Sequence, residues 1–428
     1  MLWAWPPSQP RATCRLSPPL MQLPPIESHH TNVKDMPLRG LGVLDIGTMI
    51  AGPFAATLMA DFGADVIKVE HPTQGDPLRG WPPIKNGQSL WWKVIARNKQ
   101  LLSLNLSHRE GQAILRELAR EADVLIENFR PKTLERWDLG PEVLHSVNPR
   151  LVVARVSGYG QSGPYSRRPG YATIAEAYSG IPSFTGFSDK PPTLSAFPLG
   201  DYVAALFAFS GIMMALREAE ATGCGQVVDT SLYEPLFRLV ESQVVGYDQL
   251  GLVKTRRGNR MDEDSPRNAY ATSDGEWVVI STGSNRTFDR LARAIGRPEL
   301  AQDPRFIDNP ARVVNGDELD AIIAEWIQAR ELHEVLATFE EHDVVAGVVY
   351  DIRRIFEDPH YAARENIITI RDEDFGALRM QGVVPLLSRT PGQVRHTGRS
   401  IGHDSEEILR RLDLSEAQIA ALRRERVT

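Results

Sequence analysis

The stretch that decides the fold is residues 42–70, GVLDIGTMIAGPFAATLMADFGADVIKVE. Residues 42–46 form a short apolar run, which predicts a buried strand. Pro53 follows at a position suited to the first turn of a helix, and Gly63 is suited to end that helix. Residues 64–70 predict a second strand. A strand, a helix and a strand in so short a segment predict two parallel strands joined by a right-handed crossover.

The alternation of strands and helices continues through the first half of the chain. Apolar runs at 101–106, 123–126 and 151–157 predict three more strands. Ser107 and Glu110 have the spacing of a capping box, which predicts that a helix begins there. Strands that alternate with helices are typical of an α/β domain, so we expect a Rossmann-like large domain with a parallel sheet.

The second half of the chain predicts a smaller α+β domain. Residues 227–231 and 277–281 predict strands, 316–329 predicts a helix, and 265–275 is rich in turn residues. The expected organisation is a disordered extension at 1–36 (or a start codon placed too early, with Met36 as the true first residue), the first part of the large domain at 37–224, the small domain at 225–340, and a linker that returns to the large domain at 341–428.

Composition excludes several functional classes. The net charge of -7 and the pI of about 5.9 argue against nucleic acid as a partner. The two cysteines, Cys14 and Cys224, form no metal-ligand pattern with histidine, so we expect no metal and a reducing compartment, the cytoplasm. The longest apolar run, 203–216, is shorter than the roughly 20 residues that span a bilayer. We therefore expect no membrane partner.

The familiar cofactor motifs are missing from the predicted sheet. No G-x-G-x-x-G follows the first strand, so dinucleotide binding is not supported. The sequence also contains no P-loop lysine motif and no G-x-S-x-G nucleophile elbow. We expect no permanently bound cofactor.

Asp201 is the first candidate for chemistry. It stands in PLGDY at 198–202, directly before a long apolar run. A carboxylate that begins an apolar helix is commonly an N-cap, and the pattern alone favours that interpretation. The alternative is a nucleophile with helix N–H groups nearby for developing oxyanions.

Polar residues also follow the predicted strands, where open α/β sheets bind their ligands. Asn128, Phe129 and Arg130 follow one strand, and Arg136 comes one turn later. Arginine suits phosphate, although a single loop arginine is more often only solvated. Further polar candidates after other predicted strands are His71, Arg79, Asn98 and Lys99.

Taken together, these residues resemble the class III CoA-transferase family, which also includes α-methylacyl-CoA racemases. No single motif is specific, but the ordered set spans about 38–420. The matching pieces, in chain order, are Leu44-Asp45, Ala51-Gly52-Pro53, residues 62–70 (FGADVIKVE), Gly75-Asp76-Pro77, Arg79-Gly80, Asn98-Lys99, Ala122-Asp123-Val124, residues 127–131 (ENFRP), Gly158-Tyr159-Gly160, Pro164-Tyr165, Gly170-Tyr171, Pro191-Pro192, Gly200-Asp201, Thr222-Gly223 and Gly225-Gln226.

The resemblance implies a large α/β domain built from both ends of the chain, a small domain between them, and two subunits interlocked like chain links. It implies that Asp201 is the nucleophile and that coenzyme A is a substrate. Asp201 would form an acyl-aspartyl anhydride and release CoA thiolate, so no ATP is needed. The implied CoA-binding residues are Ile50, Ala51, His71, Leu104, Asn128, Phe129, Arg130, Arg136 and Tyr171.

Departures from the family pattern sharpen the substrate hypothesis. Some formyl-specific members carry Gln where this chain has Ile50, which argues against oxalate or formate. The glycine-rich loop of those members is replaced by a region that contains Arg260 and Arg267, which we expect to bind the distal carboxylate of a dicarboxylic acid. The hypothesis is succinyl-CoA as donor and a dicarboxylate or hydroxydicarboxylate as acceptor.

Two other functions stay open. An α-methylacyl-CoA racemase would need two bases, and racemases resembling this chain carry His where this chain has Tyr171, whose ordinary pKa near ~10 makes it a poor base. A non-catalytic acyl-CoA binding protein would be favoured by loss of the carboxylate at 201, yet Asp201 is present.

Overall fold

A six-stranded sheet is the centre of the fold. The computed structural model describes residues 36–428, so the predicted extension at 1–36, apart from Met36, lies outside the described residues, as does Cys14. The strand order is β5-β2-β1-β6-β7-β8, and every neighbouring pair is parallel. The sheet strands are β1 (Gly42–Asp45), β2 (Asp65–Glu70), β5 (Gln100–Ser103), β6 (Val124–Glu127), β7 (Val152–Ser157) and β8 (Val227–Ser231).

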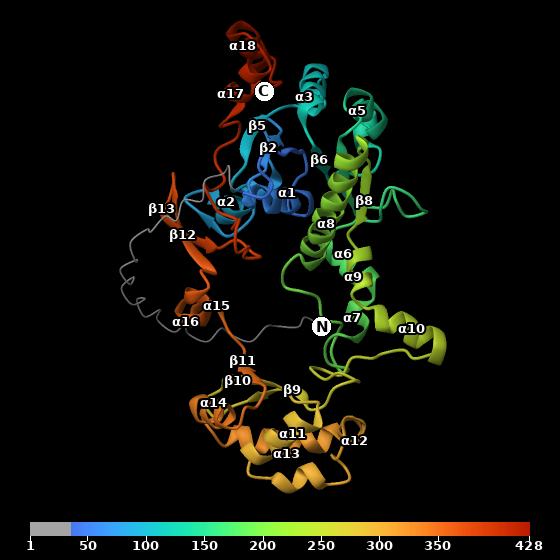
Figure 1. Ribbon diagram of the computed structural model, residues 1–428, viewed down its shortest axis with the longest axis vertical. Helices are drawn as coiled ribbons and strands as arrows, with labels where there is room; N and C mark the ends of the chain where they lie inside the picture. The colour runs from blue at the N-terminus through green and yellow to red at the C-terminus, as the bar shows by residue number, and fades with distance from the viewer. Residues whose placement is uncertain (1–35) are drawn as a thin grey trace, which may run out of the picture. The chain divides into compact units, whose positions relative to one another are not determined.

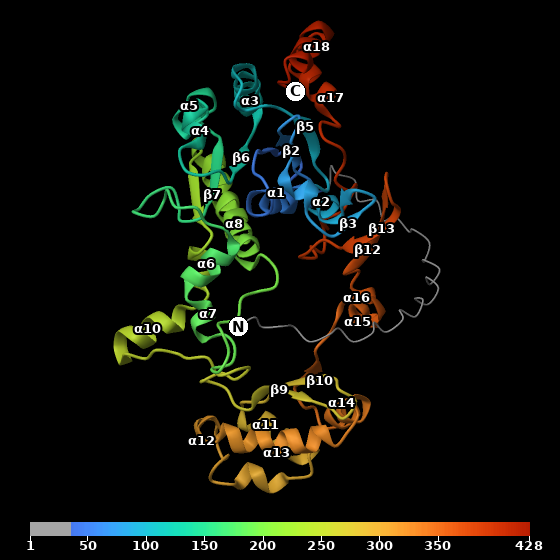
Figure 2. The same cartoon turned by 180° about the vertical axis from the view of Figure 1, so that it is seen from behind.

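This order confirms the Rossmann-like parallel sheet and locates its switch point. The chain first winds outward from β1 to β2 and β5, and then returns to the other side of β1 at β6. Ligands of such sheets bind outside the carboxyl ends of the strands where the winding reverses, here between β1 and β6. Figures 1 and 2 show β2, β5 and β6 of this sheet from opposite sides.

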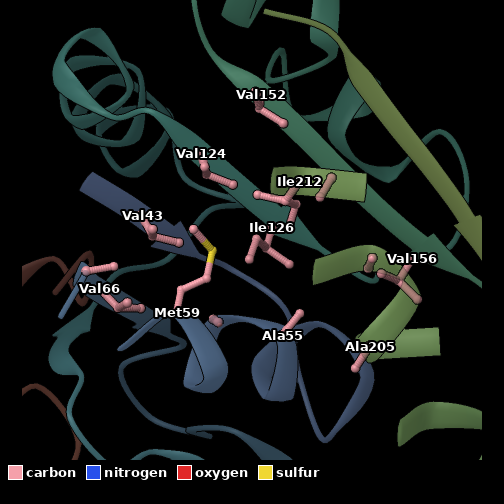
Figure 3. Close-up of a cluster of buried hydrophobic side chains, with 14 of the residues drawn as sticks. Val43, Ala55, Met59, Val66, Val124, Ile126, Val152, Val156, Ala205 and Ile212 are labelled. Atoms are coloured by element: carbon pink, nitrogen blue, oxygen red, sulfur yellow. The ribbon is translucent and has the colours of Figure 1, made fainter. Parts of the chain in front are cut away.

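Helices cover both faces of the sheet. Alternate strand residues such as Val43 and Leu44 belong to different hydrophobic clusters, so each face has its own core. Figure 3 shows one of them, in which Val124 and Ile126 of β6 pack with Met59. The elements of this half are α1 (Ala51–Asp61), η2 (Pro77–Gly80), β3 (Ile84–Lys85), β4 (Gln88–Ser89), α2 (Leu90–Ile95), α3 (Arg109–Glu121), α4 (Thr133–Arg136), α5 (Pro141–Val147), α6 (Ala172–Ser179), α7 (Ile181–Phe184), α8 (Leu199–Thr222), α9 (Glu234–Arg238) and α10 (Glu241–Leu250).

The C-terminal segment covers the edge strand β5. The backbone N–H groups of Leu101, Ser103 and Asn105 donate to Asp404 Oδ2 (2.7 Å), Ser405 Oγ (3.0 Å) and Val427 O (2.7 Å). These are the groups on the side of β5 that faces away from β2. Figure 1 shows the red C-terminal helices beside β5 and α3. Residues 404–427 thus contact the outer edge of the main sheet.

The remaining elements include a three-stranded antiparallel sheet, β11-β10-β9. Its strand β9 lies in the segment 265–275, which was predicted only to be rich in turns.

The main sheet includes β8, so this sheet extends past the predicted domain boundary at 225. The remaining elements are β9 (Arg267–Ala271), β10 (Trp277–Ser281), α11 (Asn285–Ala294), η3 (Pro298–Gln302), α12 (Asn309–Val314), α13 (Gly316–Gln328), α14 (Leu332–Glu341), β11 (Ala346–Val348), α15 (Ile352–Glu357), α16 (Pro359–Ala363), β12 (Ile367–Asp372), β13 (Gly376–Gln381), α17 (Ser405–Arg411) and α18 (Glu416–Arg424).

Two local predictions were wrong. The capping box at 107–110 does not form, because the Ser107 hydroxyl donates to Asn105 Oδ1 (2.6 Å) and His108 occupies the N-cap of α3. The apolar helix is longer than the run at 203–216: α8 has 24 residues and an 18-residue window of mean hydropathy 1.7. By length and composition it could cross a membrane, and 39% of that window is buried in the fold.

Candidate functional site

The predicted CoA-binding residues gather at the carboxyl ends of the strands. His71, Leu104 and Asn128 each come directly after the last residue of β2, β5 and β6. Ile50 is the N-cap of α1, and Ala51 is its first residue. Because parallel strands end at the same edge of a sheet, the fold brings these five positions to one edge.

A two-way amide contact joins the loops on either side of the switch point. Asn128 Oδ1 accepts from the Thr48 N–H (2.7 Å), and Asn128 Nδ2 donates to the Thr48 carbonyl (2.7 Å). The neighbouring Phe129 donates its N–H to Glu127 Oε2 (2.7 Å) and packs edge-on against Trp137. Asn128 thus fixes the backbone of the loop after β1.

Two predicted arginines carry a charge that no nearby carboxylate neutralises. Arg130 and Arg136 are exposed, and neither forms an ion pair with any residue between 36 and 428. Arg136 only donates to the Thr133 hydroxyl (3.0 Å). Exposed guanidinium groups that have no carboxylate partner are well suited to bind phosphate groups.

The other polar residues proposed after strands are bound internally. Arg79 forms a salt bridge with Glu70 (2.7 Å). Asn98 and Lys99 are buried, and they bind Asp61 (2.8 Å) and Asp45 (2.9 Å). These three side chains stabilise the fold instead of facing a ligand.

Asp201 stands in the first turn of α8 without a partner. The helix begins at Leu199, so its N-cap is Pro198 and no side chain caps it. The N-cap interpretation of Asp201 was therefore wrong. Within the described part of the chain, the Asp201 carboxylate accepts no hydrogen bond and forms no ion pair.

Burial and the negative charge of Glu176 raise the pKa of Asp201 from 3.8 to about 6. The carboxylate is still mostly ionised at pH 7, but it is poorly solvated and more basic than a surface aspartate. Both properties favour nucleophilic attack. A raised pKa beside an open position is also typical of functional sites.

Aromatic side chains connect Asp201 with the start of α1. The next residue, Tyr202, accepts a hydrogen bond from Trp91 Nε1 (3.1 Å), and its ring lies edge-on against Phe54, 4.8 Å between centroids. Phe54 belongs to the first turn of α1, next to Ala51. The sequence analysis did not single out Trp91 or Tyr202; a Trp-Trp pair and an aromatic neighbour of Asp201 were the only signals.

Tyr171 lies close to the same helix start. It is the N-cap of α6 and is 74% exposed. A Cβ added to Gly200 would lie only 3.0 Å from the carbonyl oxygen of Ala172, so the first turns of α6 and α8 touch there. Glycine at 200 permits this close approach because it has no Cβ. Tyr171, next to Ala172, therefore lies near Gly200 and the start of the helix that bears Asp201.

The two arginines proposed for substrate line a separate cavity of about 1080 Å³. Arg260 bonds to Asp320 (2.6 Å) and also to Asp317, so its charge is already neutralised. Arg267 donates to the Asn259 carbonyl (2.7 Å) and forms no ion pair within residues 36–428. Asp201 is not among the lining residues.

No group of three or more His, Cys, Asp or Glu side chains in the described residues could hold a metal ion. The chemistry available at this edge of the sheet is that of a carboxylate, aromatic side chains and cationic loops.

Comparison with known proteins decides the family. The model of CoA-transferase family III matches residues 38–405. The chain belongs to this family. It is 44% identical, over 91% of its length and 98% of the relative's, to succinyl-CoA–D-citramalate CoA-transferase of Chloroflexus aurantiacus. It is 43% identical, over 92% of its length and 98% of the relative's, to the succinyl-CoA–L-malate CoA-transferase beta subunit of the same organism.

Solved structures agree with the sequence relatives. The crystal structure of a CAIB/BAIF family protein from Brucella suis superposes with a TM-score of 0.79 at 29% identity, and covers 89% of this chain and 100% of that chain. The resemblance stated from the residues is confirmed, and the chain is a family III CoA-transferase, an enzyme that transfers CoA between an acyl-CoA and a carboxylic acid.

Proposed function

We propose that this enzyme moves CoA from succinyl-CoA to a dicarboxylic or hydroxydicarboxylic acid, with Asp201 as the covalent nucleophile. The assignment of Asp201 as the nucleophile rests on its carboxylate, which has no hydrogen-bond or ion-pair partner among the described residues and whose pKa is raised to about 6. The substrate class is supported by relatives named for succinyl-CoA with citramalate or malate and for succinate with glutarate.

The proposed reaction consists of four acyl-transfer steps, all of which form or break a bond to the Asp201 carboxyl group. An Asp201 oxygen attacks the succinyl carbonyl, the C–S bond breaks, and CoA thiolate leaves a succinyl-aspartyl anhydride. The thiolate attacks Cγ of Asp201, which releases succinate and leaves an aspartyl-CoA thioester. The acceptor carboxylate displaces the thiolate and forms a second anhydride. The thiolate then attacks the acceptor acyl carbon, which restores Asp201.

Every intermediate in this sequence is an activated acyl group, so no ATP is consumed. The anhydrides must be protected from water. The aromatic side chains around Tyr202, including Trp91 and Phe54, supply an apolar wall beside Asp201. The free cations of Arg130 and Arg136 would bind the phosphates of CoA.

The enzyme is also proposed to act as an interlocked homodimer. Helix α10 has no buried residue, and its side chains Val245, Tyr247 and Leu250 are more than 60% exposed. Phe207 and Met214 of α8 are exposed as well. Apolar surfaces of this extent usually mark interfaces, and a second copy of the chain is the occupant that the family resemblance implies. A monomer in analytical ultracentrifugation at micromolar concentration would contradict this proposal.

Arg267 is the proposed contact for the distal carboxylate of the acid, because its guanidinium has no acidic partner within residues 36–428. Arg267 and Asp201 do not line the same cavity within one chain, so this contact is proposed to form between the two subunits of the homodimer. Arg260 remains a weaker candidate, since Asp317 and Asp320 already bind it. Substitution Arg267→Ala is expected to reduce the use of succinyl-CoA while acetyl-CoA is unaffected. Equal effects on both donors would exclude a carboxylate-binding role.

The test of the nucleophile is covalent trapping. The enzyme is incubated with a panel of acyl-CoA donors, without acceptor, and hydroxylamine is added. Peptide mass spectrometry is expected to find a hydroxamate on Asp201 with succinyl-CoA, and none in Asp201→Asn. Deuterium that enters the acyl α-carbon in heavy water, with no adduct, would instead indicate a racemase. CoA binding with neither signal would indicate a binding protein.

A further inference from the structure

The loop between β1 and α1, residues 47–50, is held by side chains from other parts of the chain. Met49 has φ of 62°, a left-handed conformation that is strained for a residue other than glycine. The Gly47 N–H donates to Asp45 Oδ1 (3.1 Å), and Asn128 binds both backbone polar groups of Thr48. A strained conformation of this kind persists only where its surroundings hold it.

Asp76 holds the strained residue itself. Its carboxylate accepts the Met49 N–H with Oδ1 at 3.0 Å and Oδ2 at 3.2 Å. The same carboxylate accepts the Leu78 N–H (2.9 Å) and forms a salt bridge with Lys68 Nζ (3.1 Å). Asp76 is only 2% exposed, so these contacts have replaced water. It lies 27 residues along the chain from Met49.

Lys68 connects Asp76 with the rest of the loop. Its ammonium group donates to the Gly47 carbonyl and lies 3.7 Å from Asp45 Oδ1. Asp45 also pairs with Lys99 (2.9 Å), which donates to the Pro53 carbonyl in α1 (2.7 Å). Two lysines and two aspartates, all buried, thus form an electrically balanced network. This network fixes the loop at both ends.

We infer that Asp76, through Lys68 and the Met49 N–H, is a positioning residue for CoA. It acts on Ile50 and Ala51, which the family resemblance implies as CoA-binding residues, by holding the preceding residue, Met49, in the left-handed conformation. Asp76 does not need to touch the substrate for this role. The inference rests on the proposed CoA site at the switch point, and it assigns a function to a buried ion pair that would otherwise only stabilise the fold.

The test compares two buried aspartates that pair with lysine. Calorimetric titration with CoA is expected to show at least tenfold weaker binding for Asp76→Asn. The matched control is Asp372→Asn, because Asp372 is also 2% exposed, pairs with Lys93 (3.1 Å) and accepts two backbone N–H groups. The control variant is expected to lose stability but to bind CoA within twofold of wild type.

A second substitution separates positioning from general damage. Glycine adopts the left-handed conformation without strain, so adding Met49→Gly to Asp76→Asn is expected to restore part of the CoA affinity. If Asp76→Asn does not fold, Met49→Gly and Met49→Val are compared in the wild-type background. The valine variant is expected to bind CoA at least tenfold more weakly than the glycine variant.

The outcomes are distinguishable. Wild-type enzyme that binds CoA, together with Asp76→Asn of unchanged affinity, overturns the inference alone. Equal CoA affinity of the valine and glycine variants at 49 also overturns it. Wild-type enzyme that does not bind CoA overturns the proposed function and this inference with it.

Discussion

Asp61 is buried and Asp201 is half-buried, but only Asp61 has hydrogen-bond and ion-pair partners among the described residues. Asp61, at the end of α1, binds the Arg97 guanidinium (2.5 Å to Nη2) and Asn98 Nδ2 (2.8 Å). Asp201 has no hydrogen bond or ion pair within residues 36–428. A carboxylate whose lone pairs are occupied contributes to folding, whereas one that is desolvated and left without donors keeps its lone pairs for an electrophile. The contrast is one of function against stability.

The largest expected effect concerns catalysis. Substitution Asp201→Asn removes the nucleophile with almost no change of shape, so we expect kcat for CoA transfer to fall by about 10,000-fold. Steady-state assay with succinyl-CoA and a dicarboxylate measures it, and CoA binding should be retained. Residual activity above about a tenth of wild type would show that Asp201 is not the nucleophile.

The next largest effect concerns the stability contributed by Asp61, which pairs with Arg97. Substitution Asp61→Asn leaves Arg97 buried without its counter-charge, so we expect the free energy of unfolding to fall by about 3–5 kcal/mol. Urea denaturation measures the change. The exposed pair Asp289–Arg293 provides the control, since Asp289→Asn should change the free energy of unfolding by less than about 0.5 kcal/mol. Equal losses in the two variants would contradict the assignment.

A smaller effect of opposite sign is expected at Asp201. Its pKa is raised from 3.8 to about 6, so the folded state binds the proton more tightly than the unfolded state and the ionised form is destabilising. At pH 7 to 8, Asp201→Asn should therefore increase the free energy of unfolding by about 3 kcal/mol. The difference from wild type should shrink as the pH falls from about 6 to about 4. A destabilised Asp201→Asn at pH 7 would refute this account.

The smallest effect concerns the neighbour of Asp201. The charge of Glu176 helps to raise the pKa of Asp201, and attack requires the ionised form. The acid limb of kcat/KM should therefore lie near pH 6, and Glu176→Gln should move it to lower pH by less than one unit. The exposed Glu117→Gln serves as control and should leave the profile unchanged.

The sequence predicted the strands of the main sheet because both faces of that sheet are buried. Residues 151–156 are apolar apart from Arg155, and such a run is recognisable without tertiary information. Strand β9 was missed because its residues Arg267 and Asn268 are polar and only partly buried. The family resemblance supplied what periodicity could not, namely the role assigned to Asp201.

Contacts between distant residues could not be predicted. The capping box at Ser107 was wrong because the helix begins one residue later than the pattern predicts, so that His108 and not Ser107 is the N-cap of α3. The contact between Asp76 and Met49 joins two loops; Gly75-Asp76-Pro77 was part of the family resemblance, but nothing in that segment indicated which backbone group Asp76 would bind. A lysine such as Lys68 in the middle of a strand predicts an exposed position, yet it is buried because Asp45 and Asp76 meet it there.

The covered edge of β5 has a consequence for how the protein is made. The Ser103 N–H donates to Ser405, which lies 302 residues later in the chain and is therefore synthesised much later. At a translation rate of about 5–20 residues per second, that separation is a delay of about 15–60 s. During that time the N–H groups on the outer edge of β5 have no C-terminal partner, and this edge is open to pairing with other strands.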